Sequence, residues 1–127
     1  MNIIIADHDT ILRKKLRKIL EDNHYNVVDE ATNGLHTYDK YVAHEPDLVI
    51  ISLQMPIFNS LDTIERILSH NNKALIVVIS TQNQQKMVFD ALEKGAVHYL
   101  TTPYVNEQVI GVIEQMHHLL EERRKYV

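Results

Sequence analysis

Short apolar runs rich in Val and Ile alternate with amphipathic segments along the whole chain. The runs at residues 2–6, 26–31, 47–53, 74–80 and 97–101 are typical of β-strands. The segments at 10–22, 34–44, 60–70, 84–94 and 105–125 carry apolar residues at helical spacing, which predicts helices. Five strand-then-helix units predict one α/β domain over residues 1–127, with helices on both faces of a parallel sheet.

The strands differ in how apolar they are. The runs "IIIA", "LVII" and "LIVVI" have no polar face, so we expect these three strands at the centre of the sheet. The runs "NVVDEA" and "VHYLT" are mixed and are expected at its edges.

The last predicted helix is more apolar than a covering helix needs to be. Val112 and Leu119 widen the apolar arc sideways, and this extra width suits either the core or a partner surface. His117 and His118 are expected at the surface or in an interface. The stripe that faces the core is predicted to be Val109, Ile113, Met116 and Leu120.

Composition narrows the classes of function. The chain has 17 acidic and 13 basic residues, a formal charge of -4, and no basic run that could follow a phosphate backbone, so we expect no direct nucleic-acid binding. It has no cysteine, and no apolar stretch long enough for a signal peptide or a membrane span. These features predict a soluble cytoplasmic protein that does not bind membranes.

Polar residues follow the predicted central strands, where ligands bind in doubly wound sheets. They are Asp7, His8 and Asp9, then Ser52, then Ser80. No Gly-x-Ser-x-Gly turn surrounds either serine, so we expect no hydrolase and no enzyme. The acidic, glycine-free stretch "ADHDT" also disfavours binding of a nucleotide or flavin phosphate.

Five stretches of the sequence together resemble the receiver domain of bacterial two-component response regulators. They are "IIIADHDTILRKKL", "EATNG", "PDLVIISLQMP", "ALIVVIST" and "EKGAVHYLTTPY", in the order and at the spacing of that family. The resemblance implies a flavodoxin-like (βα)5 fold with strand order 2-1-3-4-5. It also implies an aspartate phosphorylated by a histidine kinase, and Mg²⁺ held by an acidic pair after the first strand.

Several residues that carry this mechanism are replaced here. The phosphoacceptor position falls on Ser52, the second acid of the pair on His8, and the conserved lysine position on Thr102. The loop after the acceptor has Ile57 and Ser60 where the family usually has glycine.

Other family positions are kept. The first acid is present as Asp7, the switch hydroxyl as Ser80 and the switch aromatic residue as Tyr99. Pro103 is also retained, and the resemblance implies a cis Thr102–Pro103 peptide bond.

The replacements are physically consistent with one another. Serine would form a stable phosphate ester in place of a labile acyl phosphate, and the Mg²⁺ site has lost carboxylate ligands. Two carboxylates about 4 Å apart repel by roughly 4 kcal/mol at an effective dielectric of 20, so their loss also removes the need for a lysine. We therefore expect weak or absent Mg²⁺ binding and no other cofactor, and we expect Asp7 to accept hydrogen bonds from Ser52 and Thr102.

Two further roles for this acidic segment remain open. Asp7 and His8 are candidate ligands for a transition metal, because imidazole and carboxylate suit zinc or nickel, but adjacent residues seldom bind one ion. His8 could instead sense pH, since it lies between Asp7 and Asp9.

The sequence thus favours a pseudo-receiver that works without phosphorylation as a protein-interaction module. The resemblance implies a homodimer surface over Gln84–Lys94, Val97–Thr101 and Val105–Arg124, including Tyr99, Val112 and Leu119. We expect the N-terminal regulatory domain of a bacterial transcription regulator whose DNA-binding part lies outside this chain. The alternatives are a stand-alone adaptor, an unconventional phospho-switch, and a metal or small-ligand sensor that uses the altered pocket.

Overall fold

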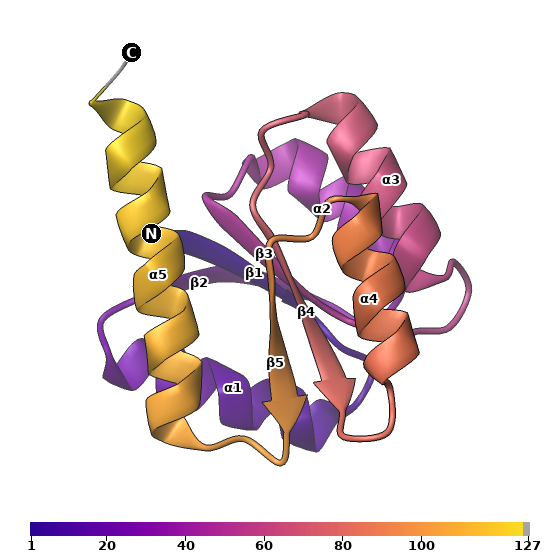
Figure 1. The fold of residues 1–127 in the computed structure, drawn as a ribbon, viewed down its shortest axis with the longest axis horizontal. Coiled ribbons are helices and arrows are strands. Elements are labelled where there is room, and N and C mark those ends of the chain that lie inside the picture. Colours follow the sequence, from indigo (N-terminus) through magenta and orange to yellow (C-terminus); the bar gives the residue numbers. More distant parts are fainter. Residues whose placement is uncertain (126–127) are drawn as a thin grey trace.

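The computed structural model describes residues 1–125, in which five strands alternate with five helices (Figure 1). The strands are β1 (Asn2–Ala6), β2 (Asn26–Ala31), β3 (Leu48–Ser52), β4 (Ile76–Thr81) and β5 (His98–Thr102). The helices are α1 (Thr10–Asp22), α2 (Gly34–His44), α3 (Ser60–His70), α4 (Gln85–Lys94) and α5 (Asn106–Arg124).

The strands form one parallel sheet in the order β2-β1-β3-β4-β5, which confirms the flavodoxin-like arrangement. The three runs without a polar face are the central strands, and every residue of β3 is buried. The two mixed runs, β2 and β5, are the edge strands, each paired with a single neighbouring strand within residues 1–125.

Each face of the sheet has its own apolar core. Helices α1 and α5 cover one face, and their buried residues include Leu16 and Ile113. Helices α2, α3 and α4 cover the other, and their buried residues include Tyr41, Ile67 and Ala91. The two helix layers account for the all-apolar sequences of the central strands.

Short polar side chains begin three of the helices. Asp9 accepts a hydrogen bond from the Leu12 amide at 3.0 Å at the start of α1. Asn33 and Asn59 begin α2 and α3 in the same way, each with an amide donor three residues ahead at 2.9 Å. These caps fix where each loop at the carboxyl edge of the sheet ends.

The last two strands differ slightly from their predicted bounds. β4 begins at Ile76 because a turn around Asn71 still holds the chain before it; the Ala74 amide donates to the Asn71 carbonyl at 3.1 Å. β5 extends to Thr102, which pairs with Thr81. The Thr102–Pro103 peptide bond is cis, which confirms that prediction. No helix within residues 1–125 could cross a membrane.

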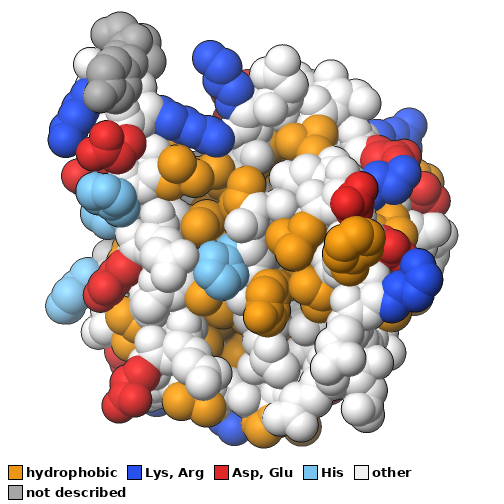
Figure 2. All heavy atoms as spheres, viewed as in Figure 1, with side chains coloured by type: hydrophobic (Ala, Val, Ile, Leu, Met, Phe, Trp, Pro, Cys, Tyr) orange, Lys and Arg blue, Asp and Glu red, His pale blue; other side chains and the backbone are white. Residues whose placement is uncertain are grey.

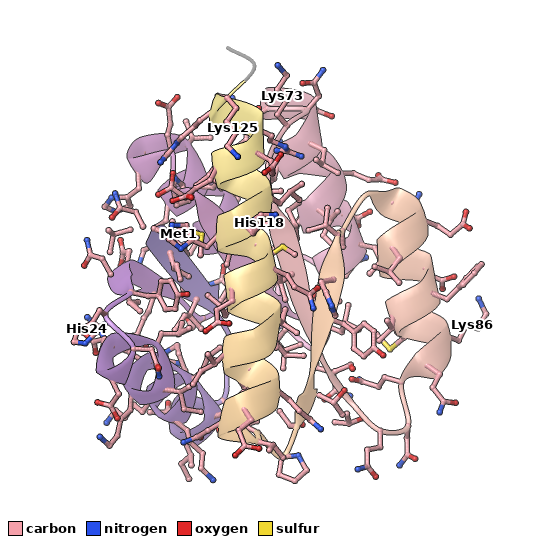
Figure 3. The ribbon with its side chains drawn as sticks, turned by 60° about the vertical axis from the view of Figure 1, so that its left-hand side comes forward. Met1, His24, Lys73, Lys86, His118 and Lys125 are labelled. Atoms are coloured by element: carbon pink, nitrogen blue, oxygen red, sulfur yellow. The ribbon has the colours of Figure 1, made fainter. Side chains whose placement is uncertain are left out.

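Helix α5 runs beside β5 on the opposite side from α4 (Figure 3). Val112 and Leu119 are half-buried and pack against the core, so much of the extra apolar width of α5 is core. His118 lies at the surface, with 76% of its side chain exposed. His117 is partly exposed and packs edge-on against the Tyr25 ring.

The β3–α3 loop holds one residue in an unfavourable backbone conformation. Ile57 has φ 75°, in the left-handed region that β-branched residues avoid, and its side chain is 79% exposed. We expect Ile57→Gly to raise the free energy of unfolding by about 1 kcal/mol and the Tm by about 3 °C, because the strain is relieved and little burial is lost.

Ile11→Gly is the matched control for this thermal measurement. Ile11 is 78% exposed but lies in the first turn of α1, where glycine should cost about half a kcal/mol. Destabilisation by both substitutions would contradict the assignment of strain to Ile57.

Candidate functional site

The carboxyl ends of four strands surround a small cavity of about 80 Å³. It is the place where the sequence predicts a ligand site, and the structure brings six of the predicted residues together there. Pro103 and Tyr99 do not line it. The lining residues are Asp7, His8, Asp9, Leu12, Ser52, Gln54, Ile79, Ser80, Thr81, Gln84 and Thr102.

Asp7 is the buried anion of this cavity. Its residue is only 3% exposed, and Oδ1 accepts a hydrogen bond from the Asp9 amide at 3.0 Å. Oδ2 is buried and has no hydrogen-bond partner among the described residues. Burial disfavours the charged form and raises the pKa of Asp7 above its ordinary value.

The hydroxyl groups near Asp7 do not bind it, contrary to our expectation. Ser52 Oγ accepts a hydrogen bond from the Gln54 amide at 3.2 Å, and Thr102 Oγ1 donates a long one to the Ser80 carbonyl at 3.4 Å. Both hydroxyls therefore satisfy nearby main-chain groups, which are closer competitors than a side chain on another strand.

Two buried polar side chains were not predicted from the sequence: Gln84, which lines the cavity, and Tyr104, which does not. Gln84 is 8% exposed, and its Oε1 accepts a hydrogen bond from the Thr81 amide at 2.8 Å, while Nε2 is buried without a partner. Tyr104 has a buried hydroxyl, likewise without a partner in residues 1–125. Burial, together with the charges of Asp7 and Asp9, raises the Tyr104 pKa, so its hydroxyl stays neutral.

The residues present do not fit the Mg²⁺ ion that the fold family implies. Mg²⁺ needs an octahedral set of oxygen ligands, usually with one or two carboxylates. Here Asp9 Oδ1 is engaged in capping α1, His8 is exposed, and Gln84 presents an amide nitrogen with no free electron pair. No cluster of three or more metal-ligating side chains occurs within residues 1–125.

A second, larger hollow of about 690 Å³ lies between α4 and β5. Hydrophobic side chains gather over this part of the surface in Figure 2. Tyr99 lies here, 43% exposed, together with Phe89, 61% exposed. The full lining is Ser80, Thr81, Gln82, Asn83, Gln85, Val88, Phe89, Leu92, Tyr99 and Thr101.

The exposure of apolar side chains on α4 was also not predicted from their pattern in the sequence. Five of its residues are apolar, but only Ala91 is buried, while Met87, Phe89 and Leu92 are exposed. The sequence did contain a signal for this exposure, because α4 has more apolar residues than one face of a helix can bury.

Comparison with known proteins identifies the family. The model of the response regulator receiver domain matches residues 3–114, and the chain belongs to this family. It is 30% identical over 115 residues to the chemotaxis protein CheY of Listeria monocytogenes, covering 91% of this chain and 97% of that protein. It is 33% identical over 113 residues to CheY of Bacillus subtilis, covering 89% of this chain and 94% of that one.

Solved structures agree on the fold. The receiver domain of AraT, a response regulator from Geobacillus stearothermophilus, superposes with a TM-score of 0.90 at 22% identity, with 97% of each chain covered. NtrX from Brucella abortus gives 0.91 at 18% identity over 98% of this chain and 28% of that one. The protein is thus a receiver domain of two-component signal transduction.

A cluster of ion pairs holds the Asp7 segment against α1 and β2. Arg13 donates to the Asp7 main-chain oxygen at 2.7 Å and pairs with Glu30 at 2.7 Å, and Glu30 also pairs with Arg17 at 2.5 Å. Burial alone would raise the pKa of Glu30, but the hydrogen bonds from Arg17 and Arg13 outweigh it and lower the pKa below its ordinary value. The charged form of Glu30 therefore stabilises the fold.

We expect Glu30→Gln to reduce the free energy of unfolding by about 1–2 kcal/mol at pH 7. Because the folded-state pKa is lowered, this stabilisation is present above the unfolded-state pKa and disappears as the pH falls through the folded-state pKa. Urea unfolding at pH 7 and pH 3 measures it. If Glu30→Gln lowers the free energy of unfolding by as much at pH 3 as at pH 7, the effect does not come from the charge of Glu30.

Proposed function

We propose that this receiver domain works without aspartyl phosphorylation, as a protein-interaction module that forms a homodimer. The chemistry of the cavity carries this proposal. Asp7 is the one buried acidic residue in the described part of the chain, and Ser52 stands where the family resemblance places the phosphoacceptor. Hydroxyl groups and an amide surround Asp7, so neither an acyl phosphate nor Mg²⁺ has its usual partners.

The interaction surface is the α4–β5–α5 face. Phe89 and Tyr99 border the large α4–β5 groove, and a second groove of about 330 Å³ between β5 and α5 includes Tyr99, Val105 and Val112. Exposed apolar residues that are contiguous over three elements are typical of an interface. Leu119 contributes less than the sequence suggested, because it packs against the core.

The dimer would control a transcriptional output in a longer bacterial regulator. The second candidate is a stand-alone adaptor, which is favoured by coverage of 97% of the Listeria CheY sequence, so that protein is about as long as the matched region. An unconventional phospho-switch and a metal or small-ligand sensor remain alternatives for the cavity.

Ser52→Asp alone should not restore phosphorylation by acetyl phosphate with Mg²⁺. The introduced carboxylate would still lack the second acid at position 8 and the cation at position 102. The triple variant His8→Asp, Ser52→Asp, Thr102→Lys should gain one phosphoryl group, detected by intact mass spectrometry.

The double variant His8→Asp, Thr102→Lys, which keeps Ser52, is the control and should stay unlabelled. Robust labelling of the Ser52→Asp single variant would contradict this account of the cavity.

Phe89→Asp should weaken self-association at least about tenfold, because it places a charge in the apolar groove. Sedimentation velocity over a concentration series measures the dissociation constant.

Ile11→Asp is the control, since Ile11 is also an exposed apolar residue (78% against 61% for Phe89), lies in the first turn of α1 and lines neither groove. A wild-type chain that stays monomeric at high concentration, or equal effects of both variants, would exclude this dimer.

A further inference from the structure

The end of β4 and the loop that joins it to α4 form a wall shared by the two hollows. Ser80 and Thr81 line both the small cavity and the α4–β5 groove. Gln82 and Asn83 line the groove alone, and Gln84 lines the cavity alone. A movement of this loop would therefore change both hollows together.

Gln84 closes this loop from the cavity side. Its side-chain Oε1 accepts from the Thr81 amide at 2.8 Å, and its own amide donates to the Thr81 carbonyl at 3.3 Å. Gln84 stands at the cap position of α4 but makes no side-chain hydrogen bond to that helix. Its carbonyl accepts from the Val88 amide at 2.9 Å, so the residue joins the loop to the first turn of α4.

The side-chain nitrogen of Gln84, Nε2, has no hydrogen-bond partner among the described residues. Nε2 is a buried donor and Asp7 Oδ2 a buried acceptor, neither has a protein partner in residues 1–125, and both residues line the same small cavity. Buried polar groups are rarely left unpaired, and a polar cavity of this size has room for water. A water between the two would satisfy the donor and the acceptor at once.

We propose that Gln84 is a latch, anchored to Thr81 directly and to Asp7 through water, that holds the β4–α4 loop and the α4–β5 groove in one conformation. The latch gives Asp7 a positioning role that needs neither metal nor phosphate. This inference deepens the proposed function, because it explains how the interaction surface is kept in one state without a phosphoryl trigger. It does not depend on dimerisation.

The test compares Gln84→Met and Gln84→Ala with wild type by NMR. Gln84→Met keeps the bulk of the side chain and removes both hydrogen bonds, so it separates the latch from simple filling of space. We expect both variants to speed hydrogen exchange of the Thr81 amide about tenfold, because that donor loses its acceptor. We also expect exchange broadening on the μs–ms timescale at Tyr99 and Thr101, across the groove.

Gln85→Ala is the matched control, because Gln85 is the next residue, is exposed and lines only the groove. It should leave Thr81 exchange unchanged. Asp7→Ala should reproduce the Thr81 and Tyr99 effects in part, and the Asp7→Ala, Gln84→Met double variant should add little to Gln84→Met alone.

Three results would overturn the latch: wild-type Thr81 exchange in Gln84→Met, no change at Tyr99 and Thr101, or fully additive effects of the Asp7 and Gln84 substitutions. Repeating the measurement in the Phe89→Asp background separates the two proposals. In that background the effects of Gln84→Met on Thr81, Tyr99 and Thr101 should persist even though self-association is weakened. The latch can therefore be tested even if the protein forms no dimer.

Discussion

Burial of the three central strands on both faces is the constraint on which the rest of the structure depends. β1, β3 and β4 can lose water on both sides only if helices cover the sheet above and below, which requires parallel strands joined by helical crossovers. The carboxyl ends of parallel strands all lie at the same edge of the sheet. Asp7, Ser52 and Ser80 therefore become neighbours although they are far apart in the sequence.

At that edge the balance of charge decides the chemistry. Burial disfavours the charged form of the Asp7 carboxylate and outweighs the opposing effect of the nearby Arg13 charge, which is why the Asp7 pKa is raised. The position that the resemblance assigns to lysine holds a threonine whose hydroxyl binds main chain. A small cavity with few cationic partners is suited to internal hydrogen bonding, and a larger hollow lies beside α4 and β5.

The sequence predicts the fold well because strand burial leaves a clear pattern. The three runs without a polar face are the central strands, and the two mixed runs are the edge strands. Side-chain direction leaves no such pattern. Nothing in "TQNQQ" distinguishes buried Gln84 from exposed Gln85, and the hydroxyl of Ser52 turns to a main-chain amide two residues away. The exposure of Phe89 could not be predicted, because α4 has apolar residues on several sides and its pattern does not show which side faces the core.

The most direct test of a silent phosphorylation site is titration of the natural chain with beryllofluoride and Mg²⁺, followed by amide chemical shifts. We expect no saturable shifts at Asp7, Ser52 or Tyr99 up to millimolar concentrations, with a conventional receiver as the positive control. Saturable shifts at these three residues would contradict it.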